Sequence, residues 1–184
     1  MNLPNKLTMM RIILVPIVAA IYLLVPGDFG IMIPSWHFGM RNLLVLILFA
    51  VASITDYLDG SIARKHHLIT SFGKFADPIA DKLLVNTLLI LLAWSHDASV
   101  VAVLLMSARD LIVDGLRMTA AQKGRVVSAG WWGKVKTVLQ MIAVIFILLG
   151  APGKSLLLWA ACVASLYSGW IYFMKLKKYV LESM

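Results

Sequence analysis

Four aspartates between residues 56 and 81 have a spacing that suits shared chemistry. Asp56 and Asp59 are three residues apart, and Asp77 and Asp81 are four apart. In an α-helix, either spacing places the two side chains of a pair on one face. The 184-residue chain holds only nine acidic residues, so four carboxylates in this short stretch are a marked concentration.

Carboxylates gathered in this way repel one another unless cations bind among them. Oxygen ligands suit hard divalent ions such as Mg²⁺ or Mn²⁺, whose coordination is completed by water and by substrate phosphates. Two such ions about 4 Å apart can hold the attacking and the leaving oxygens of a phosphoryl displacement. The spacing therefore favours a metal site for phosphoryl transfer.

A purely structural interpretation accounts for the same residues. Asp77 followed by Pro78 is a common helix start, with aspartate as the N-cap and proline at the first helical position. Asp56 and Asp59 would then pair with nearby cations, of which Arg64 and Lys82 are candidates. The spacing alone leaves both interpretations open.

The composition indicates that the helices carrying these aspartates lie in a membrane. Hydrophobic residues make up 61% of the chain and charged residues only 14%, and the mean hydropathy is +0.88. A soluble domain has about 25% charged residues. The net charge is +8, and the basic residues are scattered between apolar runs. This distribution is typical of positive cytoplasmic loops and argues against nucleic-acid binding.

We expect an all-α integral membrane protein with six transmembrane helices, forming one membrane domain over residues 1–184. A short interfacial segment at residues 1–6 is expected to precede the first helix. The six predicted spans are 7–26, 41–63, 77–95, 98–121, 134–151 and 155–175.

The basic residues predict the orientation of these spans, because cytoplasmic loops carry an excess of Lys and Arg. Only Arg41 and Lys154 fall on the predicted outer side, so both termini and the aspartates are expected to face the cytoplasm. The basic residues on the cytoplasmic side are Lys6, Arg11, Arg64, Lys65, Lys74, Lys123, Arg125, Lys134, Lys136, Lys175, Lys177 and Lys178.

Three of the uncharged runs are too short to cross a bilayer alone. They cover residues 42–55, 83–96 and 98–108, whereas a spanning helix needs about 20 residues. Charged residues must therefore lie at or below the headgroups, where ionisable groups are costly and mark functional sites. They are Asp56, Asp59, Asp77, Asp81, Arg109, Asp110, Asp114 and Arg117.

The aspartates belong to a longer pattern, which reads Asp56-x2-Asp59-Gly60-x2-Ala63-Arg64-x8-Gly73-x3-Asp77-x3-Asp81. At every fixed position it resembles the signature of the CDP-alcohol phosphatidyltransferases. The resemblance implies a six-helix membrane enzyme, commonly a homodimer, with a polar cavity open to the cytoplasm. Such an enzyme transfers a phosphatidyl group from CDP-diacylglycerol to an alcohol and releases CMP.

The resemblance also implies roles for individual residues. The four aspartates would bind two divalent ions, Mg²⁺ or Mn²⁺, and Asp81 would be the base that accepts the hydroxyl proton. The small residues of the pattern would let cytidine and pyrophosphate approach the backbone, although tight helix packing explains them too. The residues implied in CDP-lipid binding are Asp56, Gly60, Ala63, Arg64, Gly73, Asn5 and Thr8.

The second half of the chain bears on the acceptor alcohol. Arg109, Arg117, Lys134 and Lys136 form a cationic excess that suits an acceptor with its own phosphate. Together with residues 2–11, this part resembles the family members that use glycerol 3-phosphate. One departure is Asp110, where many of those enzymes are expected to have Glu.

Alternatives remain at this stage. Asp110, Asp114 and Arg117 share a helix face, so internal ion pairing explains them as well. Inositol phosphate, phosphatidylglycerol or serine are alternative acceptors within the family. A divalent-cation transporter is an alternative of another class, but its ion site should lie near the midplane. We expect a multi-pass enzyme of the bacterial cytoplasmic membrane.

Overall fold

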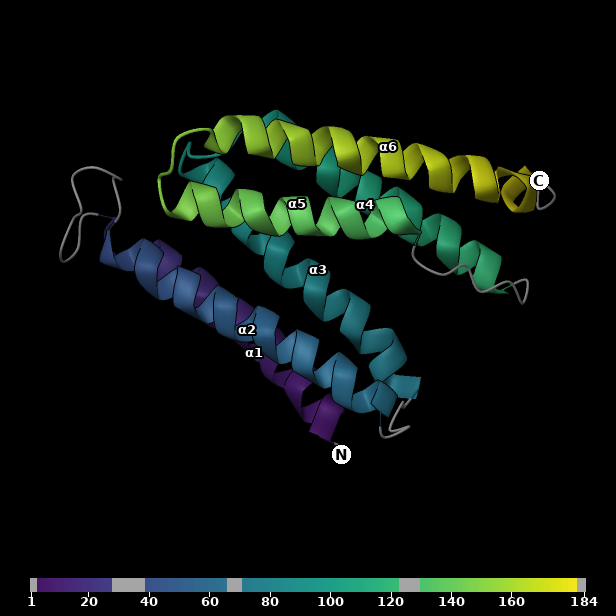
Figure 1. The fold of residues 1–184 in the computed structure, drawn as a ribbon, viewed down its shortest axis with the longest axis horizontal. Helices are drawn as coiled ribbons and strands as arrows, with labels where there is room; N and C mark the ends of the chain where they lie inside the picture. The colour runs from purple at the N-terminus through teal and green to yellow at the C-terminus, as the bar shows by residue number, and fades with distance from the viewer. Residues whose placement is uncertain (1–2, 28–38, 66–70, 123–129, 182–184) are drawn as a thin grey trace. The chain divides into compact units, whose positions relative to one another are not determined.

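The computed structural model describes residues 3–27, 39–65, 71–122 and 130–181, and within these ranges the chain forms six α-helices and no strand (Figure 1). The all-α prediction with six helices is thereby confirmed. The helices are α1 (Leu3–Leu24), α2 (Met40–Lys65), α3 (Ser71–Trp94), α4 (Val100–Gln122), α5 (Trp131–Leu148) and α6 (Lys154–Leu181).

The beginning of α1 differs from the expected separate segment at residues 1–6. Residues 3–6 continue into the helix without a break. Pro4 does not interrupt it, because the N–H groups of the first turn have no intrahelical acceptor in any case. How this first turn lies relative to the headgroups stays a prediction.

Hydropathy separates the six helices into two kinds. In the described residues, three helices are long and apolar enough to cross a membrane, with spans at Asn5–Leu24, Trp131–Leu148 and Lys154–Lys177. The apolar parts of α2 and α3 are shorter, at Met40–Thr55 and Lys82–Trp94. The charged positions of α2 and α3 therefore adjoin short apolar stretches, as the sequence indicated.

The chain divides into two compact units. The first contains Met1–Leu91 and Leu148–Ala151, and in it α1 packs along α2. Val18 and Tyr22 of α1 are buried there with Val45 and Phe49 of α2. Arg41 at the start of α2 lies over the ring of Tyr22, with 4.3 Å between the guanidinium carbon and the ring centroid.

The second unit contains Leu92–Ile147 and Pro152–Met184, and in it α4 packs along α6. Val113 and Ala120 of α4 form a buried cluster with Tyr172 and Leu176 of α6. Small residues face inward on α6, among them Ala161, and such residues let helix backbones approach closely. This unit holds the basic residues that the sequence assigned to the acceptor.

Candidate active site

The four aspartates of the signature lie on two consecutive helices of the first unit. Asp56 and Asp59 are in the last part of α2, and Asp77 and Asp81 are in the first part of α3. Both stretches are helical, and residues three or four positions apart in an α-helix lie on one face. In the sequence, residues 66–70 separate the two helices, so the end of α2 and the beginning of α3 are at most about 22 Å apart.

The metal-binding prediction itself falls outside what the structure describes. The side chains of residues 56–78 and of Asp81 are not among the described ones. The same holds for the roles assigned to Gly60, Ala63, Arg64 and Gly73, which lie in the same stretch of the chain. Ligation of two ions by the aspartates, and CDP-lipid binding by this stretch, therefore stay predictions.

The N-terminal residues assigned to the CDP-lipid are buried on one face of α1. Asn5 and Thr8 have little or no exposed surface, and Arg11 follows at the same three-residue spacing with 2% of its surface exposed. The position of Arg11 in the sequence predicts a cytoplasmic anchor, whereas its side chain is buried in the structure. The signal that could have found it is the spacing of residues 5, 8 and 11, which places three polar side chains on one face.

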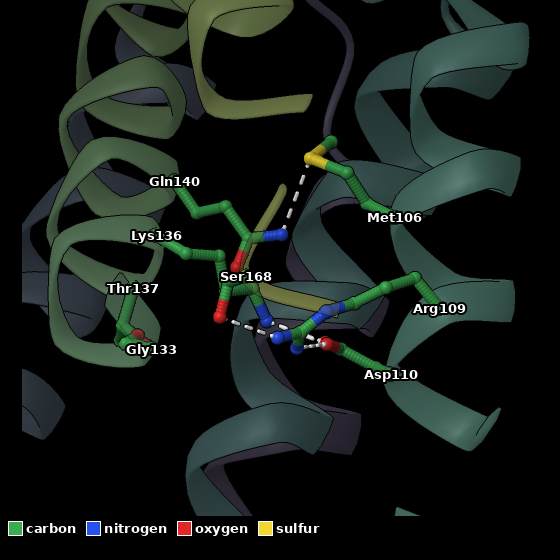
Figure 2. A network of polar contacts seen from close by, with 8 residues as sticks. All are labelled: Met106, Arg109, Asp110, Gly133, Lys136, Thr137, Gln140 and Ser168. Carbon is green, nitrogen blue, oxygen red and sulfur yellow. Dashed lines mark hydrogen bonds and ion pairs between the residues drawn. The ribbon is translucent and has the colours of Figure 1, made fainter. Parts of the chain in front are cut away.

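A buried network of charged and polar side chains joins three helices of the second unit (Figure 2). Asp110 of α4 accepts hydrogen bonds from Lys136 Nζ on α5, at 2.7 Å to Oδ1 and 2.6 Å to Oδ2. Arg109 Nη1 donates to Asp110 Oδ1 at 2.7 Å, and Arg109 Nη2 donates to Ser168 Oγ on α6 at 2.8 Å. One carboxylate thus holds cations from α4 and α5, and one of these cations is bonded to α6.

Two neighbouring residues, a glycine on α6 and a glutamine on α5, adjoin this network. Gly169 lies against the Arg109 stem, because a Cβ at position 169 would be 2.8 Å from Arg109 Cγ. Gln140, one turn after Lys136, places its Nε2 3.2 Å from the Met106 sulfur. Polar atoms therefore continue along the inner face of α5 beyond the ion pair (Figure 2).

Tyr172 of α6 contacts the beginning of α5. The Gly130 N–H donates to Tyr172 Oη at 2.6 Å. A Cβ at Gly133 would lie 3.4 Å from the same oxygen, so the first turn of α5 packs closely on this side chain. The guanidinium of Arg109 is 5.9 Å from the centre of the Tyr172 ring. The N-terminal turns of α5 are thus held by both α4 and α6.

The four basic residues assigned to the acceptor phosphate have different surroundings. Lys136 and Arg109 are 5% and 9% exposed and share the Asp110 carboxylate. Lys134 is exposed in the first turn of α5, and Arg117 is half-buried on α4. The ion pairing that the sequence left open for Asp110 is present, but its described partners are Arg109 and Lys136. Acceptor binding by these residues stays a prediction.

Sequence comparison identifies the class of protein. Residues 1–167 match the family model for CDP-alcohol phosphatidyltransferase, and the chain belongs to this family. The chain is therefore a phosphatidyltransferase, and with its apolar helices it is a multi-pass membrane protein. Enzymes of this family generally use divalent metal ions.

Several similar proteins carry the same, more particular name, CDP-diacylglycerol–glycerol-3-phosphate 3-phosphatidyltransferase. The protein of that name from Bacillus subtilis (strain 168) is 43% identical over 183 residues, which cover 95% of this chain and 94% of the relative. The one from Rickettsia bellii (strain RML369-C) is 39% identical and covers 97% of both chains. The one from Salmonella choleraesuis (strain SC-B67) is 34% identical over 80% of this chain and 76% of its own.

Proposed function

We propose that the chain transfers the phosphatidyl group of CDP-diacylglycerol to glycerol 3-phosphate and releases CMP. The observation that supports this most strongly is the similarity, over nearly the whole chain, to relatives named for that reaction. The basic residues of α4 and α5 agree with it, since glycerol 3-phosphate brings a phosphate to the site in addition to the pyrophosphate of the lipid donor.

The aspartates of α2 and α3 are suited to hold two divalent ions, Mg²⁺ or Mn²⁺. Four carboxylates within residues 56–81 provide only oxygen ligands, which is the donor set that these ions prefer. When bound, the ions would neutralise the pyrophosphate and stabilise charge on the leaving group. The donor set thus fits the metal requirement of the family.

The chemical step needs one proton acceptor from the chain. We assign this role to Asp81, which takes the proton from the primary hydroxyl of glycerol 3-phosphate. The hydroxyl oxygen then bonds to the phosphorus that carries diacylglycerol, and the bond from that phosphorus to the bridging oxygen of the pyrophosphate breaks. CMP leaves with the bridging oxygen, so the phosphatidyl group is transferred without a change of oxidation state.

The remaining residues of the signature would hold the CDP-lipid. Gly60, Ala63 and Gly73 lack bulky side chains and let the nucleotide approach the helix backbone, while Arg64 offers a planar fork of donors to a phosphate. On α1, the buried polar face with Asn5 and Thr8 provides further hydrogen-bonding groups. Arg11 of the same face joins this set.

The acceptor phosphate is assigned to the cationic residues of the second unit. Lys134 is exposed and Arg117 is half-buried, and both carry a charge that suits a phosphate. Arg109 and Lys136 add positive charge from within the unit. We further propose that the enzyme is a homodimer of the bacterial cytoplasmic membrane, with its active site open to the cytoplasm, where CMP is released and glycerol 3-phosphate is supplied.

The proposed reaction is tested by following both products. Purified protein in detergent, given CDP-diacylglycerol, Mg²⁺ and radiolabelled glycerol 3-phosphate, should move the label into the organic-soluble lipid with one CMP released per label transferred. Label that stays in the aqueous phase while CMP appears would indicate hydrolysis or another acceptor, and would contradict the proposal.

Replacing Lys134 with glutamine is expected to raise the KM for glycerol 3-phosphate by about tenfold, because it removes one charge-assisted bond to a phosphate. The KM for CDP-diacylglycerol should change less than twofold in the same preparation. Lys154→Gln is the matched control, since Lys154 lies beyond the opposite end of α5 and pairs with Asp97. Equal effects of the two substitutions on the KM for glycerol 3-phosphate would count against the assignment.

A further inference from the structure

The network between α4, α5 and α6 contains buried charged residues, which helix packing alone does not require. Its charged members, Arg109, Asp110 and Lys136, are all at least nine-tenths buried, as is Ser168. Charged groups inside a membrane domain are costly and are retained at functional sites. Two cations share one carboxylate, so Asp110 is an ion-pair partner of both.

The described hydrogen bonds of the two buried cations stay within the network. Lys136 directs its ammonium at both oxygens of Asp110. Arg109 uses one terminal nitrogen on Asp110 and the other on Ser168, and its Nε lies against Gly169, where a Cβ would approach within 3.0 Å. The described hydrogen bonds of Arg109 and Lys136 thus go to Asp110 and to Ser168 of α6.

Lys134 lies between two attachments of α5. Before it, the Gly130 N–H is bonded to Tyr172, and after it Lys136 is bonded to Asp110. Positions 134 and 136 are about 200° apart around a helix, so burying Lys136 turns Lys134 toward the exposed side, as observed. Lys136 thus pairs with Asp110 on the buried face of α5, while Lys134 lies on the exposed face.

We propose that Asp110 is a positioning residue: by holding Lys136 and Arg109, it fixes the first turns of α5 so that Lys134 meets the phosphate of the acceptor. This rests on the proposed function, in which Lys134 binds that phosphate. It assigns Arg109 and Lys136 an indirect role, in contrast to direct contact with the phosphate. Asp110 touches neither substrate in this account.

The Asp110→Asn variant separates the two roles, because they predict opposite signs. If Asp110 positions α5, removing its charge loosens Lys134, and the KM for glycerol 3-phosphate rises on the order of tenfold or more. If Arg109 and Lys136 bind the phosphate directly, Asp110 competes with the substrate for them, and its neutralisation leaves that KM unchanged or lowers it. The KM for CDP-diacylglycerol should stay within twofold of the wild-type value.

Three further variants guard against a general loss of structure. Asp110→Glu keeps the charge and should retain a KM within about threefold of wild type. Gly169→Ala leaves every charge in place but displaces Arg109, and should raise the same KM in the same direction. Asp97→Asn breaks the half-exposed pair with Lys154 in the same unit and should leave the KM unchanged. If the Asp110→Asn protein does not fold, the KM of the Gly169→Ala protein for glycerol 3-phosphate tests the positioning role instead.

A double variant completes the test. In a positioning role, Lys136→Gln adds little to Asp110→Asn, because the same attachment is already broken. An additive effect of the two substitutions would mean that Lys136 contacts the phosphate itself and would overturn the proposal.

The wild-type protein distinguishes failure of this inference from failure of the proposed function. If wild-type protein uses a different phosphorylated alcohol, the proposed acceptor is wrong and the same KM comparison with that alcohol decides the role of Asp110. If the acceptor carries no phosphate, the positioning proposal falls with the acceptor.

Discussion

Asp81→Asn is expected to reduce CMP release by about a thousandfold or more, since it removes the proposed proton acceptor. The substitution would also weaken one of the proposed metal ligands, because a neutral amide replaces a carboxylate. The backbone of α3 should tolerate the change, as asparagine and aspartate are nearly equal in size. The measurement is the initial rate of CMP release from CDP-diacylglycerol and glycerol 3-phosphate at saturating Mg²⁺.

Asp97→Asn is the control for the loss of a carboxylate. Asp97 lies between α3 and α4 and pairs with Lys154 at 3.1 Å, on partly exposed side chains. Its replacement should leave the rate within about twofold, because exposed ion pairs contribute little to stability. Both variants should elute from gel filtration as the wild-type protein does. A folded Asp81→Asn protein that keeps a tenth or more of the activity would exclude Asp81 as the base.

Removal of divalent ions is expected to reduce CMP release about as much as Asp81→Asn does. Chelation should bring CMP release to the background rate, because four carboxylates would be left to repel one another and the pyrophosphate charge would be uncompensated. Adding back Mg²⁺ or Mn²⁺ in excess of the chelator should restore the activity. The measurement is the rate as a function of free metal concentration.

The shape of that dependence bears on the number of ions. Two ions predict a rate that rises more steeply than in proportion to the metal concentration at the low end. Asp77→Asn should shift the curve to higher metal concentrations while Asp97→Asn leaves it in place. Full activity of protein that retains less than one bound metal ion per chain would contradict the metal assignment.

Much of the fold could be predicted from the hydropathy pattern. Apolar runs interrupted by polar residues gave the number and order of the helices, and the observed helices differ from the expected spans mainly in their ends. The break between the last two helices contains Gly150 and Gly153 with φ of 63° and 82°, a region that favours glycine. The extension of α1 to Leu3 was not foreseen, because residues 3–6 are polar enough to be taken for a separate segment.

The partners of Asp110 could not be predicted. Helix periodicity compares residues within one helix, and it suggests internal ion pairing with Arg117, which shares a face with Asp110 and Asp114. The partner Lys136 lies on the next helix, and Ser168 enters the same network through Arg109 from the helix after that. Which cation on one helix reaches a carboxylate on another depends on how the two helices pack. A single sequence does not specify how neighbouring helices are placed relative to one another.

The burial of Arg11 does not follow from its position in the sequence, for a different reason. An arginine near the start of a membrane helix usually faces the cytoplasmic headgroups. In the structure it is buried on the face of α1 that also carries Asn5 and Thr8. Sites of charge inside such a domain are best sought by the helix face they share as well as by their distance from the end of a span.

The most direct test of the proposed function is a comparison of acceptors with purified, folded protein. CMP release from CDP-diacylglycerol with Mg²⁺ would be measured with glycerol 3-phosphate, inositol phosphate, phosphatidylglycerol and serine in separate reactions. We predict release with glycerol 3-phosphate alone, and none from the Asp81→Asn protein. Release with one of the other alcohols in place of glycerol 3-phosphate would contradict the acceptor assignment, and no release with any of them would contradict the proposed reaction.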